Sequence, residues 1–376
     1  MTSYVLDARS ATNHFPGIGR YVSNLAQAMG AQLGAEERLL LLQDSSRRSR
    51  WQLPLATEQV QRLEMAVSPF ALRQQWQIPR CLRGQQARLY HSPYYLMPYW
   101  TRLPTVLTLY DQIPRRFPHM VSARARLLFQ LTTWLALRRA DHVITISEAT
   151  RRDLLAAYRL SPERITAVPL APDSHFRPQL PAAMARIRRQ YHLPDRYLLY
   201  VGINKPHKNL VRLLEAWKLV TEDMADPPTL LIAGAWDSRY PEPMTRAAEL
   251  QLAESIRFLG PIPEKDLPAL YTGAAVFVFP SLYEGFGLPV IEAMACGTAV
   301  ACSNTSSLPE VAGDAALYFD PAIPRAIAGA IGRLLADEGL RNELAQRGMA
   351  QAAQFSWSKT AEATLRIYRQ MTKPDA

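Results

Sequence analysis

Short, fully apolar runs alternate with longer helical patterns along the whole 376-residue chain, and this alternation restricts the fold more than any other feature. The runs that we expect to be strands are residues 4–6, 39–42, 105–109 and 142–146 in the first half, and residues 197–201, 229–233, 275–279 and 299–302 in the second. Apolar strands separated by helices are typical of a parallel sheet that is covered on both faces. We therefore predict an α/β protein with two doubly wound domains and a ligand-binding cleft between them.

The composition excludes several classes of protein. Apolar residues make up 48% of the chain and charged residues 20%, which is ordinary for a globular protein and unlike a disordered one. No apolar run approaches the ~18–20 residues that a membrane-spanning helix needs, and residues 1–20 contain no apolar core of a signal peptide. Cys81, Cys296 and Cys302 lack the spacing of a disulfide framework or a zinc site. We expect a cytoplasmic protein.

The net charge of +10 is confined to the first half of the chain. Residues 1–180 contain 23 Arg, no Lys and 12 acidic residues, a net charge of +11, whereas residues 181–376 contain 20 basic and 21 acidic residues, a net charge of −1. This asymmetry indicates that the first half faces an anionic partner, such as a nucleic acid, a membrane surface or a phosphorylated substrate. Residues 122–140 form a candidate amphipathic helix with basic ends; core packing is the commoner use of such a helix, and an anionic bilayer is the alternative.

The most specific segment is FPSLYEGFGLPVIEAMACG, residues 279–297. It predicts a strand that ends at Phe279, a loop, and a helix with Pro289 as its first residue and Gly297 after its end. The backbone N–H groups of Gly287 and Leu288 would then point out of a helix N-terminus, a geometry that binds a diphosphate.

Two carboxylates accompany this loop. Glu284 lies within it, and Glu292 is expected on the first turn of the helix, so that one can face a sugar while the other accepts hydrogen bonds from ribose hydroxyls. A second candidate site is Lys208, because the strand at 197–201 leads into a loop that ends in Lys208 just before a helix. An ammonium group there would stabilise a leaving diphosphate; the alternative is a solvated surface lysine.

A glycine loop, Gly17-Ile18-Gly19-Arg20, precedes the first expected helix at residues 20–29. Gly-x-Gly before a helix is by itself often only a tight turn. Arg20 is equally well explained as a phosphate contact or as an exposed helix residue.

Together these motifs resemble the Glu-x7-Glu signature and flanking segments of the family 4 retaining glycosyltransferases, and the resemblance extends over nearly the whole chain. The matching segments are DARSATNHFPGIGRY (7–21), LYHSPYYLMP (89–98), VLTLYDQIPRRFP (106–118), VITISEATRRDL (143–154), YVGINKPHKNL (200–210) and SLPEVA (307–312). The resemblance implies the GT-B architecture of two Rossmann-like domains. It implies an N-terminal acceptor-binding domain at 1–178, a C-terminal donor-binding domain at 195–355, and a helix at 356–376 that crosses back to the first domain.

The resemblance also implies roles for single residues. Lys208 would contact the diphosphate of a nucleotide sugar, Glu284 the transferred sugar and Glu292 the ribose. The other donor-binding residues that it implies are Gly17, Gly19, Gly202, Phe286, Gly287 and Leu288.

Two positions depart from the common family pattern. Gly202 is followed by Ile203 rather than Arg, and His207 stands where Arg often precedes the lysine, so Lys205, His207 and Lys208 would share the diphosphate charge. The frequent His-Asp pair of the first domain is Tyr110-Asp111 here, and Tyr110 offers a hydroxyl but no base at neutral pH. The resemblance implies that the candidate catalytic residues are Glu284, Lys208, Tyr110 and Asp111. His91 is a further first-domain candidate for acceptor contact, with a buried, hydrogen-bonded histidine as the alternative.

No Asp-x-Asp pair occurs in the chain, so we predict a metal-independent hexosyltransferase without a cofactor. The motif set looks most like mannosyltransferases of surface polysaccharide assembly, which favours GDP-mannose over a UDP-sugar as donor. The basic half suggests a lipid-diphosphate-linked saccharide as acceptor, and a location on the inner face of the cell membrane. The alternative from another class is a polyanion- or nucleic-acid-binding protein, but no RNA- or DNA-binding motif accompanies the arginines, so no nucleic-acid partner is expected.

Overall fold

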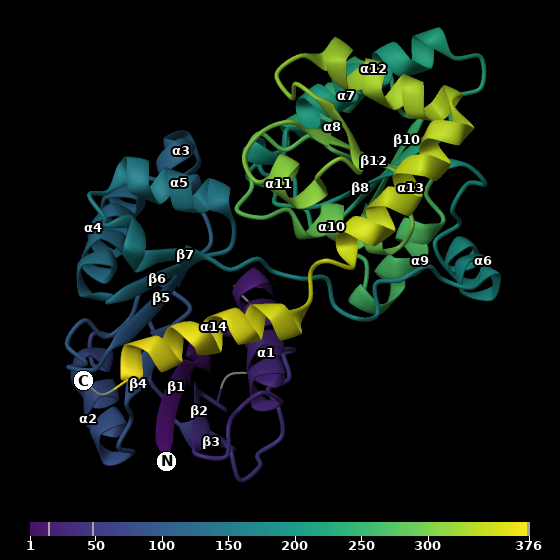
Figure 1. Ribbon diagram of the computed structural model, residues 1–376. Helices are drawn as coiled ribbons and strands as arrows, with labels where there is room; N and C mark the ends of the chain where they lie inside the picture. Colours follow the sequence, from purple (N-terminus) through teal and green to yellow (C-terminus); the bar gives the residue numbers. More distant parts are fainter. Residues whose placement is uncertain (14–15, 47–48, 374–376) are drawn as a thin grey trace. The chain divides into compact units, whose positions relative to one another are not determined.

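A computed structural model describes residues 1–13, 16–46 and 49–373. The chain forms two compact units (Figure 1): unit 1 consists of Met1–Leu170 together with Ser356–Ala376, and unit 2 of Ala171–Phe355. Residues 171–178, which the sequence assigned to the first domain, belong to unit 2. The Phe176 ring packs edge-on against Tyr271 of that unit, with the ring centres 6.1 Å apart.

Unit 1 contains a seven-stranded parallel sheet with the order β3-β2-β1-β4-β5-β6-β7. Its strands are β1 (Thr2–Asp7), β2 (Glu37–Gln43), β3 (Val60–Glu64), β4 (Leu89–Ser92), β5 (Thr105–Leu109), β6 (His142–Thr145) and β7 (Ile165–Ala167). Its helices are α1 (Pro16–Gly30), α2 (Gln74–Gly84), α3 (Ile113–Arg116), α4 (Ala123–Arg139), α5 (Glu148–Ala157) and α14 (Trp357–Thr372), with short 3-10 turns at Ala8–Ser10, Pro118–Met120 and Pro162–Arg164.

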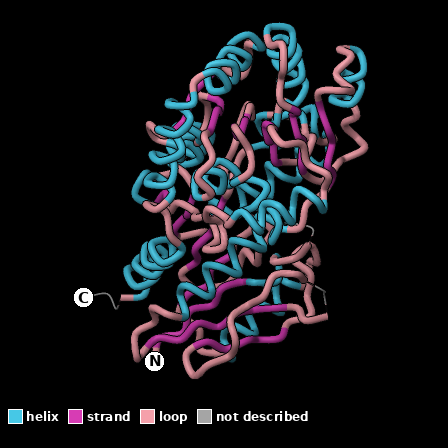
Figure 2. Tube along the Cα trace, turned by 90° about the vertical axis from the view of Figure 1, so that its right-hand side faces the viewer, coloured by secondary structure: helices cyan, strands magenta, loops and turns pink. Residues whose placement is uncertain are grey.

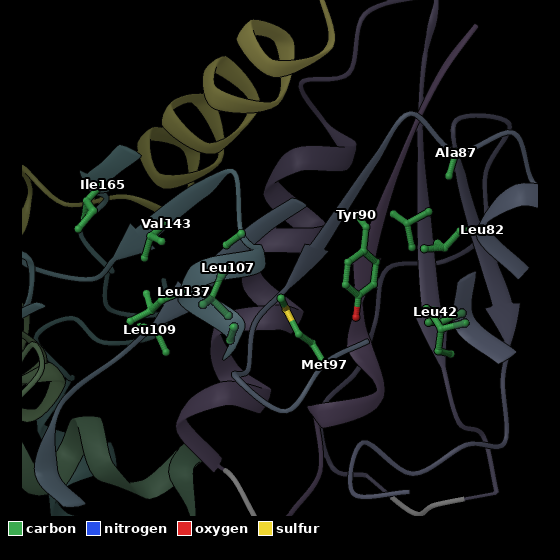
Figure 3. Packing of buried hydrophobic residues seen from close by; sticks show 14 of the residues in the cluster. Leu42, Leu82, Ala87, Tyr90, Met97, Leu107, Leu109, Leu137, Val143 and Ile165 are labelled. Carbon is green, nitrogen blue, oxygen red and sulfur yellow. The ribbon is translucent and has the colours of Figure 1, made fainter. Parts of the chain in front are cut away.

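The two faces of this sheet are covered by different helices. Alternate strand residues such as Leu107 and Val143 join a core cluster with Ile78 of α2 and Leu137 of α4 (Figure 3). The opposite face is covered by α1 and α14, where Tyr4 of β1 packs against Tyr368 with ring centres 5.2 Å apart. Burial on both faces is the reason that central strands such as β1 and β5 are largely apolar.

The last helix of the chain, α14, returns to unit 1 after the whole of unit 2. Arg369 forms an ion pair with Glu37 of β2 at 2.7 Å, and the hydroxyl of Thr360 donates to the carbonyl of Pro169 at 2.8 Å. Burial of Tyr368 between the strands and α1 adds apolar contact to these polar ones. Unit 1 is therefore closed by the C-terminal segment.

Unit 2 contains a six-stranded parallel sheet with the order β10-β9-β8-β11-β12-β13. Its strands are β8 (Tyr197–Val201), β9 (Thr229–Ala233), β10 (Ile256–Gly260), β11 (Val276–Phe279), β12 (Val300–Ser303) and β13 (Ala316–Phe319). Its helices are α6 (Pro181–Gln190), α7 (Leu210–Asp223), α8 (Glu242–Glu249), α9 (Leu267–Thr272), α10 (Leu288–Ala295), α11 (Leu308–Ala312), α12 (Pro324–Ala336) and α13 (Glu338–Ala352), with 3-10 turns η4 (Pro206–Lys208) and η5 (Glu264–Asp266).

Both sheets are doubly wound, as the sequence predicted, and their strands run side by side between helices (Figure 2). The strand order reverses between β1 and β4 in unit 1 and between β8 and β11 in unit 2. Loops that leave neighbouring strands in opposite directions create a crevice at the carboxyl ends of those strands, where ligands bind in this class of fold.

Some expectations need correction. The first helix begins at Pro16 and not at residue 20, so Gly17 and Gly19 lie in its first turn rather than in a loop before it. A proline at this place fits, because its missing N–H has no partner at a helix start. The apolar runs did not predict β3, β4, β7, β10 and β13. Within the described ranges, no helix is both long enough and apolar enough to cross a membrane.

Candidate active site

Two loops meet at the switch point of the second sheet. One follows β8 and passes through η4 into α7, and the other follows β11 and leads into α10. The backbone N–H of Leu282 in the second loop donates to the carbonyl of His207 in the first at 2.8 Å. The topology thus brings together segments that are more than seventy residues apart in the sequence, namely those with Lys208 and Glu284.

Lys208 and Glu284 form the central pair of this site. The Lys208 ammonium donates to Oε1 of Glu284 at 2.7 Å, and the two side chains are only 15% and 10% exposed. The same ammonium lies 5.3 Å from the centre of the Phe279 ring. A partly desolvated ammonium beside one carboxylate keeps further N–H donors for a second anion, which is the arrangement expected of a lysine that binds phosphate. Lys208 is therefore not a solvated surface lysine.

Three successive hydroxyl groups after β12 fix the backbone of the Glu284 loop; we name Thr305, Ser306 and Ser307 the hydroxyl clasp. Ser306 donates to the carbonyl of Glu284 at 2.5 Å and accepts from its N–H at 3.2 Å. Ser307 lies within 3.0 Å of the Glu284 carbonyl and within 2.7 Å of the Phe286 carbonyl. Thr305 reaches the carbonyl of Leu282 at 3.3 Å. The hydroxyl clasp was not predicted, although the Thr-Ser-Ser run shortly after an apolar strand was a usable signal.

Asn209 fixes the other loop. It has a φ of 61° at the start of α7, a left-handed conformation that asparagine tolerates better than most residues. Its side-chain amide donates to the carbonyls of Pro280 and Pro321 at 3.0 and 2.8 Å. The residue after Lys208 thus ties η4 to the Glu284 loop, and this role was also not predicted.

Helix α10 begins one residue earlier than predicted, at Leu288, with Gly287 as the preceding cap residue. Gly287 has a φ of 109°, and an added Cβ would lie 2.6 Å from Cδ2 of the buried Leu308. Glycine is therefore required on both conformational and steric grounds. Phe286 is a buried packing residue, edge-on to Phe355 at 5.8 Å, so its side chain supports the loop.

Glu292 lies on the second turn of α10 and not on the first, because the helix starts at Leu288. Its side chain is 3% exposed, and it accepts a hydrogen bond from the Tyr271 hydroxyl at 3.2 Å. Tyr271 belongs to α9, so the carboxylate is held between two helices.

The three basic side chains around η4 differ in charge. Burial, aided by the positive charges of Lys208 and Lys205, lowers the pKa of His207 to about 3. His207 is therefore neutral at pH 7. We had expected Lys205, His207 and Lys208 to share the charge of the diphosphate, and only the two lysines remain as candidates for that role. Lys205 opens η4, and its carbonyl accepts from the Lys208 N–H at 2.9 Å.

A small hollow of about 160 Å³ lies beside these loops at the carboxyl ends of β8, β9 and β10. Gly202 and Gly234 directly follow β8 and β9, and Gly260 is the last residue of β10. An added Cβ at Gly234 would lie 2.2 Å from the Gly202 carbonyl. Trp236 and Phe258 contribute the aromatic wall, edge-on at 5.4 Å. Only Gly202 of these residues had been singled out from the sequence.

In unit 1, Tyr110 and Asp111 follow the carboxyl end of β5. The Tyr110 ring lies edge-on to Tyr21 with centres 5.5 Å apart, and its hydroxyl has no hydrogen-bond partner among the described residues. Burial, and secondarily Tyr21, raises the pKa of Tyr110 well above its ordinary value, so the phenol stays protonated. Asp111 accepts from the N–H of Ile113 at 2.9 Å and thereby starts α3.

His91, on β4, is fully buried in unit 1. Its Nε2 lies 2.7 Å from the Thr108 hydroxyl, and its Nδ1 lies 2.5 Å from the Tyr368 hydroxyl. Burial lowers the pKa of His91 to about 3, so the ring is neutral at pH 7. Acceptor contact by His91 is not supported by this geometry, because the ring has no exposed surface; the buried, hydrogen-bonded alternative describes it.

Gly17 is exposed at the start of α1, whereas Gly19 has a packing reason to be glycine. An added Cβ at Gly19 would lie 2.1 Å from the Trp51 ring. Arg20 follows on the same helix and is partly exposed. Trp51, with Asp44 and Arg62, also lines a hollow of about 410 Å³ at the carboxyl ends of β1 and β2.

Among the described residues, one group of side chains has the spacing to hold a metal ion, namely Asp173, His175 and Glu264, whose ligand atoms lie within 4.8 Å of one another. This group lies before α6 and at the start of η5, in other loops than Lys208 and Glu284. Independence of the reaction from metal ions remains a prediction.

The chain has two doubly wound units, which is the architecture of the glycosyltransferases that its motifs resemble. In unit 2, a lysine, a carboxylate and a helix N-terminus lie together at the switch point of the sheet. Comparison with known families agrees: residues 184–351 match the glycosyl transferases group 1, and residues 16–176 match glycosyltransferase family 4. The chain belongs to this glycosyltransferase family and is a hexosyltransferase.

Individual relatives support the assignment. The O-antigen chain mannosyltransferase B of Escherichia coli is 35% identical over 306 residues, which cover 79% of this chain and 77% of that protein. The serotype-specific mannosyltransferase WbdA of Escherichia coli is 32% identical over 62% of this chain, which spans only 29% of that longer protein. Among solved structures, HepE from Anabaena, crystallised with UDP and glucose, has a TM-score of 0.77 at 18% identity, with 98% of this chain and 100% of HepE covered. At that identity the likeness concerns the fold.

Proposed function

We propose that this protein is a retaining, metal-independent mannosyltransferase of cell-surface polysaccharide synthesis. It transfers mannose from GDP-mannose to a hydroxyl group of a lipid-diphosphate-linked saccharide at the cytoplasmic face of the membrane. The donor is favoured by the mannosyltransferases among the relatives. The single observation that carries the proposal is the Lys208–Glu284 pair at the switch point of unit 2.

The diphosphate of the donor binds where positive charge is concentrated. Lys208 and Lys205 supply two ammonium groups, and the N-terminus of α10 at Gly287 and Leu288 adds backbone donors and the positive end of a helix dipole. These groups stabilise the diphosphate as negative charge develops on it, which is the largest contribution that a rigid site can make to such a reaction. Glu284 orients Lys208 and faces the transferred sugar.

The transfer breaks the bond between C1 of the sugar and the diphosphate oxygen, and forms a bond between C1 and the acceptor oxygen on the same face. The acceptor hydroxyl loses its proton to the departing phosphate oxygen. His91 and His207 are buried and have lowered pKa values, and the Tyr110 phenol is protonated, so none of these three side chains is a strong base. This favours transfer of the acceptor proton to the departing phosphate oxygen.

The two hollows suit the remaining parts of the substrates. The nucleoside is placed in the hollow with Trp236 and Phe258, where an aromatic wall and three glycines admit a flat ring. The acceptor saccharide is placed beside Trp51, Asp44 and Arg62 in unit 1, since an indole face with a few polar groups is a common way to hold a sugar.

The test compares wild type with Glu284→Gln, and with Glu254→Gln as a control at an exposed acidic residue. Thermal melting with GDP-, UDP- and ADP-sugars identifies the donor, because a ligand that binds only the folded state raises the melting temperature. We expect GDP-mannose to give the largest shift, and Glu284→Gln to lose transfer while retaining the shift. Wild-type transfer by Glu284→Gln, or no response to any nucleotide sugar, would refute the proposal.

A further inference from the structure

Helix α4 has large apolar side chains on both of its faces, and those of the outer face are exposed. Its outer face carries four large apolar residues: Leu127, Leu128, Leu131 and Trp134 are 67%, 57%, 51% and 43% exposed. Its inner face, which packs on the core of unit 1, consists of Phe129, Thr132, Thr133, Ala136 and Leu137. The sequence pattern favoured core packing for this helix, and the structure shows that only one set of its apolar side chains is used in that way.

The exposed apolar residues form one continuous stripe. Positions 127, 131 and 134 lie four and then three residues apart, which places them on one side of a helix, and position 128 borders them. Exposed apolar side chains that stand singly are ordinary on a protein surface, but a contiguous patch marks an interaction site. Figure 1 shows α4 at the periphery of unit 1. The exposed fractions of the four side chains show that the other described residues leave this stripe largely uncovered.

Basic residues frame the stripe. Arg124 and Arg126 precede it and Arg138 follows it; all three are exposed, and none forms an ion pair with another described residue. The guanidinium of Arg138 lies over the Trp134 ring, 5.0 Å from its centre. Residues 112–140 contain six arginines and no Asp or Glu. The surface therefore combines apolar contact with uncompensated positive charge.

The same combination characterises unit 1 as a whole. Of the 14 large apolar residues that are exposed among the described residues, 10 lie in unit 1. Unit 1 contains 26 Lys and Arg and 13 Asp and Glu, a net charge of +13, whereas unit 2 contains 17 and 20, a net charge of −3. Charge and exposed apolar surface are thus concentrated in the same unit, and α4 is where they coincide.

We propose that the outer face of α4 binds the surface of an anionic phospholipid bilayer. Leu127, Leu128, Leu131 and Trp134 insert at the boundary between headgroups and acyl chains, and Arg124, Arg126 and Arg138 contact lipid phosphates. Helices with an apolar face, basic flanks and an interfacial tryptophan bind such surfaces in this orientation. The purpose of this binding rests on the proposed function, because membrane contact would bring the enzyme to its lipid-linked acceptor. The binding itself requires no substrate.

The experiment is co-sedimentation of the full chain with vesicles of phosphatidylcholine alone or of phosphatidylcholine with phosphatidylglycerol, without nucleotide sugar. Two triple variants remove one property each: Leu127→Gln/Leu131→Gln/Trp134→Gln, and Arg124→Gln/Arg126→Gln/Arg138→Gln. Leu180→Gln/Ile323→Gln/Met349→Gln is the matched control, because these residues are exposed apolar residues of unit 2 and do not line the hollow with Trp236 and Phe258. All positions are exposed, so the variants should fold, which circular dichroism and thermal melting verify.

We expect wild type and the control to bind the anionic vesicles and not the neutral ones. The arginine triple should lose roughly a hundredfold in partition coefficient, since each basic residue near an anionic surface contributes about fivefold. The apolar triple should lose roughly tenfold or more. Donor-induced melting shifts should be unchanged in both variants, which separates this inference from the proposed function.

Equal binding of wild type and both variants to anionic vesicles would overturn the assignment of the surface to α4. Equal binding of the wild type to neutral and anionic vesicles would overturn the role of charge. A concentration-dependent dimer that the apolar triple abolishes, without vesicle binding by wild type, would show instead that the stripe contacts a second copy of the chain.

Discussion

Lowering the pH should destabilise unit 1 through His91. The ring is fully buried, its pKa is about 3 because of that burial, and its two nitrogens lie beside the hydroxyls of Thr108 and Tyr368. The other groups around it, Tyr21 and Tyr368, are phenols whose pKa values burial raises, so no carboxylate compensates a charged imidazole there.

The magnitude follows from the two pKa values. In the unfolded chain a histidine titrates at about 6.5, so the folded state binds this proton less readily than the unfolded state. The contribution of the neutral His91 ring to the stability of the folded state is complete above pH 6.5 and is lost as the pH falls from 6.5 towards 3. Each pH unit in that window costs about 1.4 kcal/mol, which gives about 2 kcal/mol between pH 7 and pH 5 for His91 alone.

The assay is urea unfolding at pH 7 and pH 5, followed by tryptophan fluorescence. His91→Gln has no group that titrates at this position, so its unfolding free energy should fall by about 2 kcal/mol less than that of wild type over the same interval. His119→Gln, at an exposed position, is the control and should behave like wild type. An equal loss in His91→Gln and wild type would refute the reasoning, and would mean that the ring is accessible to protons in the folded state.

Three further predictions concern the donor site. Gly287→Ala should lower the unfolding free energy by roughly 1–3 kcal/mol, because alanine must adopt a φ of 109° with its Cβ 2.6 Å from Leu308. Urea unfolding measures this free energy, and an unchanged value would contradict the glycine requirement. Lys208→Met should reduce kcat/KM by roughly a hundredfold to a thousandfold through loss of leaving-group stabilisation. Lys265→Met, at an exposed position, is the control and should leave kcat/KM unchanged. Equal kinetics of both variants would argue against a role of Lys208 in stabilising the leaving group. EDTA should leave the transfer rate unchanged, since the proposed function assigns stabilisation of the diphosphate to lysine and a helix N-terminus and not to a metal ion. A loss that Mg²⁺ or Mn²⁺ restores would show that the prediction is wrong.

Much of the fold was predictable from the sequence because buried parallel strands have a simple signature. The apolar runs at 105–109, 197–201 and 229–233 coincide with β5, β8 and β9. Four of the missed strands, β3, β7, β10 and β13, are the edge strands of the two sheets. β3 and β10 contain charged residues, and β7 has only three residues. The fifth, β4, is a central strand of four residues that includes His91 and Ser92. Edge strands lose one neighbour and are partly solvated, so continuous apolar runs do not mark them.

The candidate site was only partly predictable. Motifs located the Lys208 and Glu284 loops, but their contact across the sheet follows from the reversal of strand order between β8 and β11, which no local pattern contains. The hydroxyl clasp and the Asn209 side chain were not predicted, because serine and asparagine after a strand occur in many loops. Burial likewise decided that His91 and His207 are neutral.

The sequence by itself determined that this chain contains two doubly wound units, that its donor signature lies in the second half and that its positive charge lies in the first. These properties depend on periodicity, composition and local spacing, which survive without any knowledge of long-range contacts. Only the tertiary structure decided which way each side chain of α4 faces, because Leu127 and Leu137 belong to the same apolar pattern and differ solely in what packs against them. The arginine excess predicted an anionic partner, and the exposed stripe of α4 assigns that partner to a particular surface.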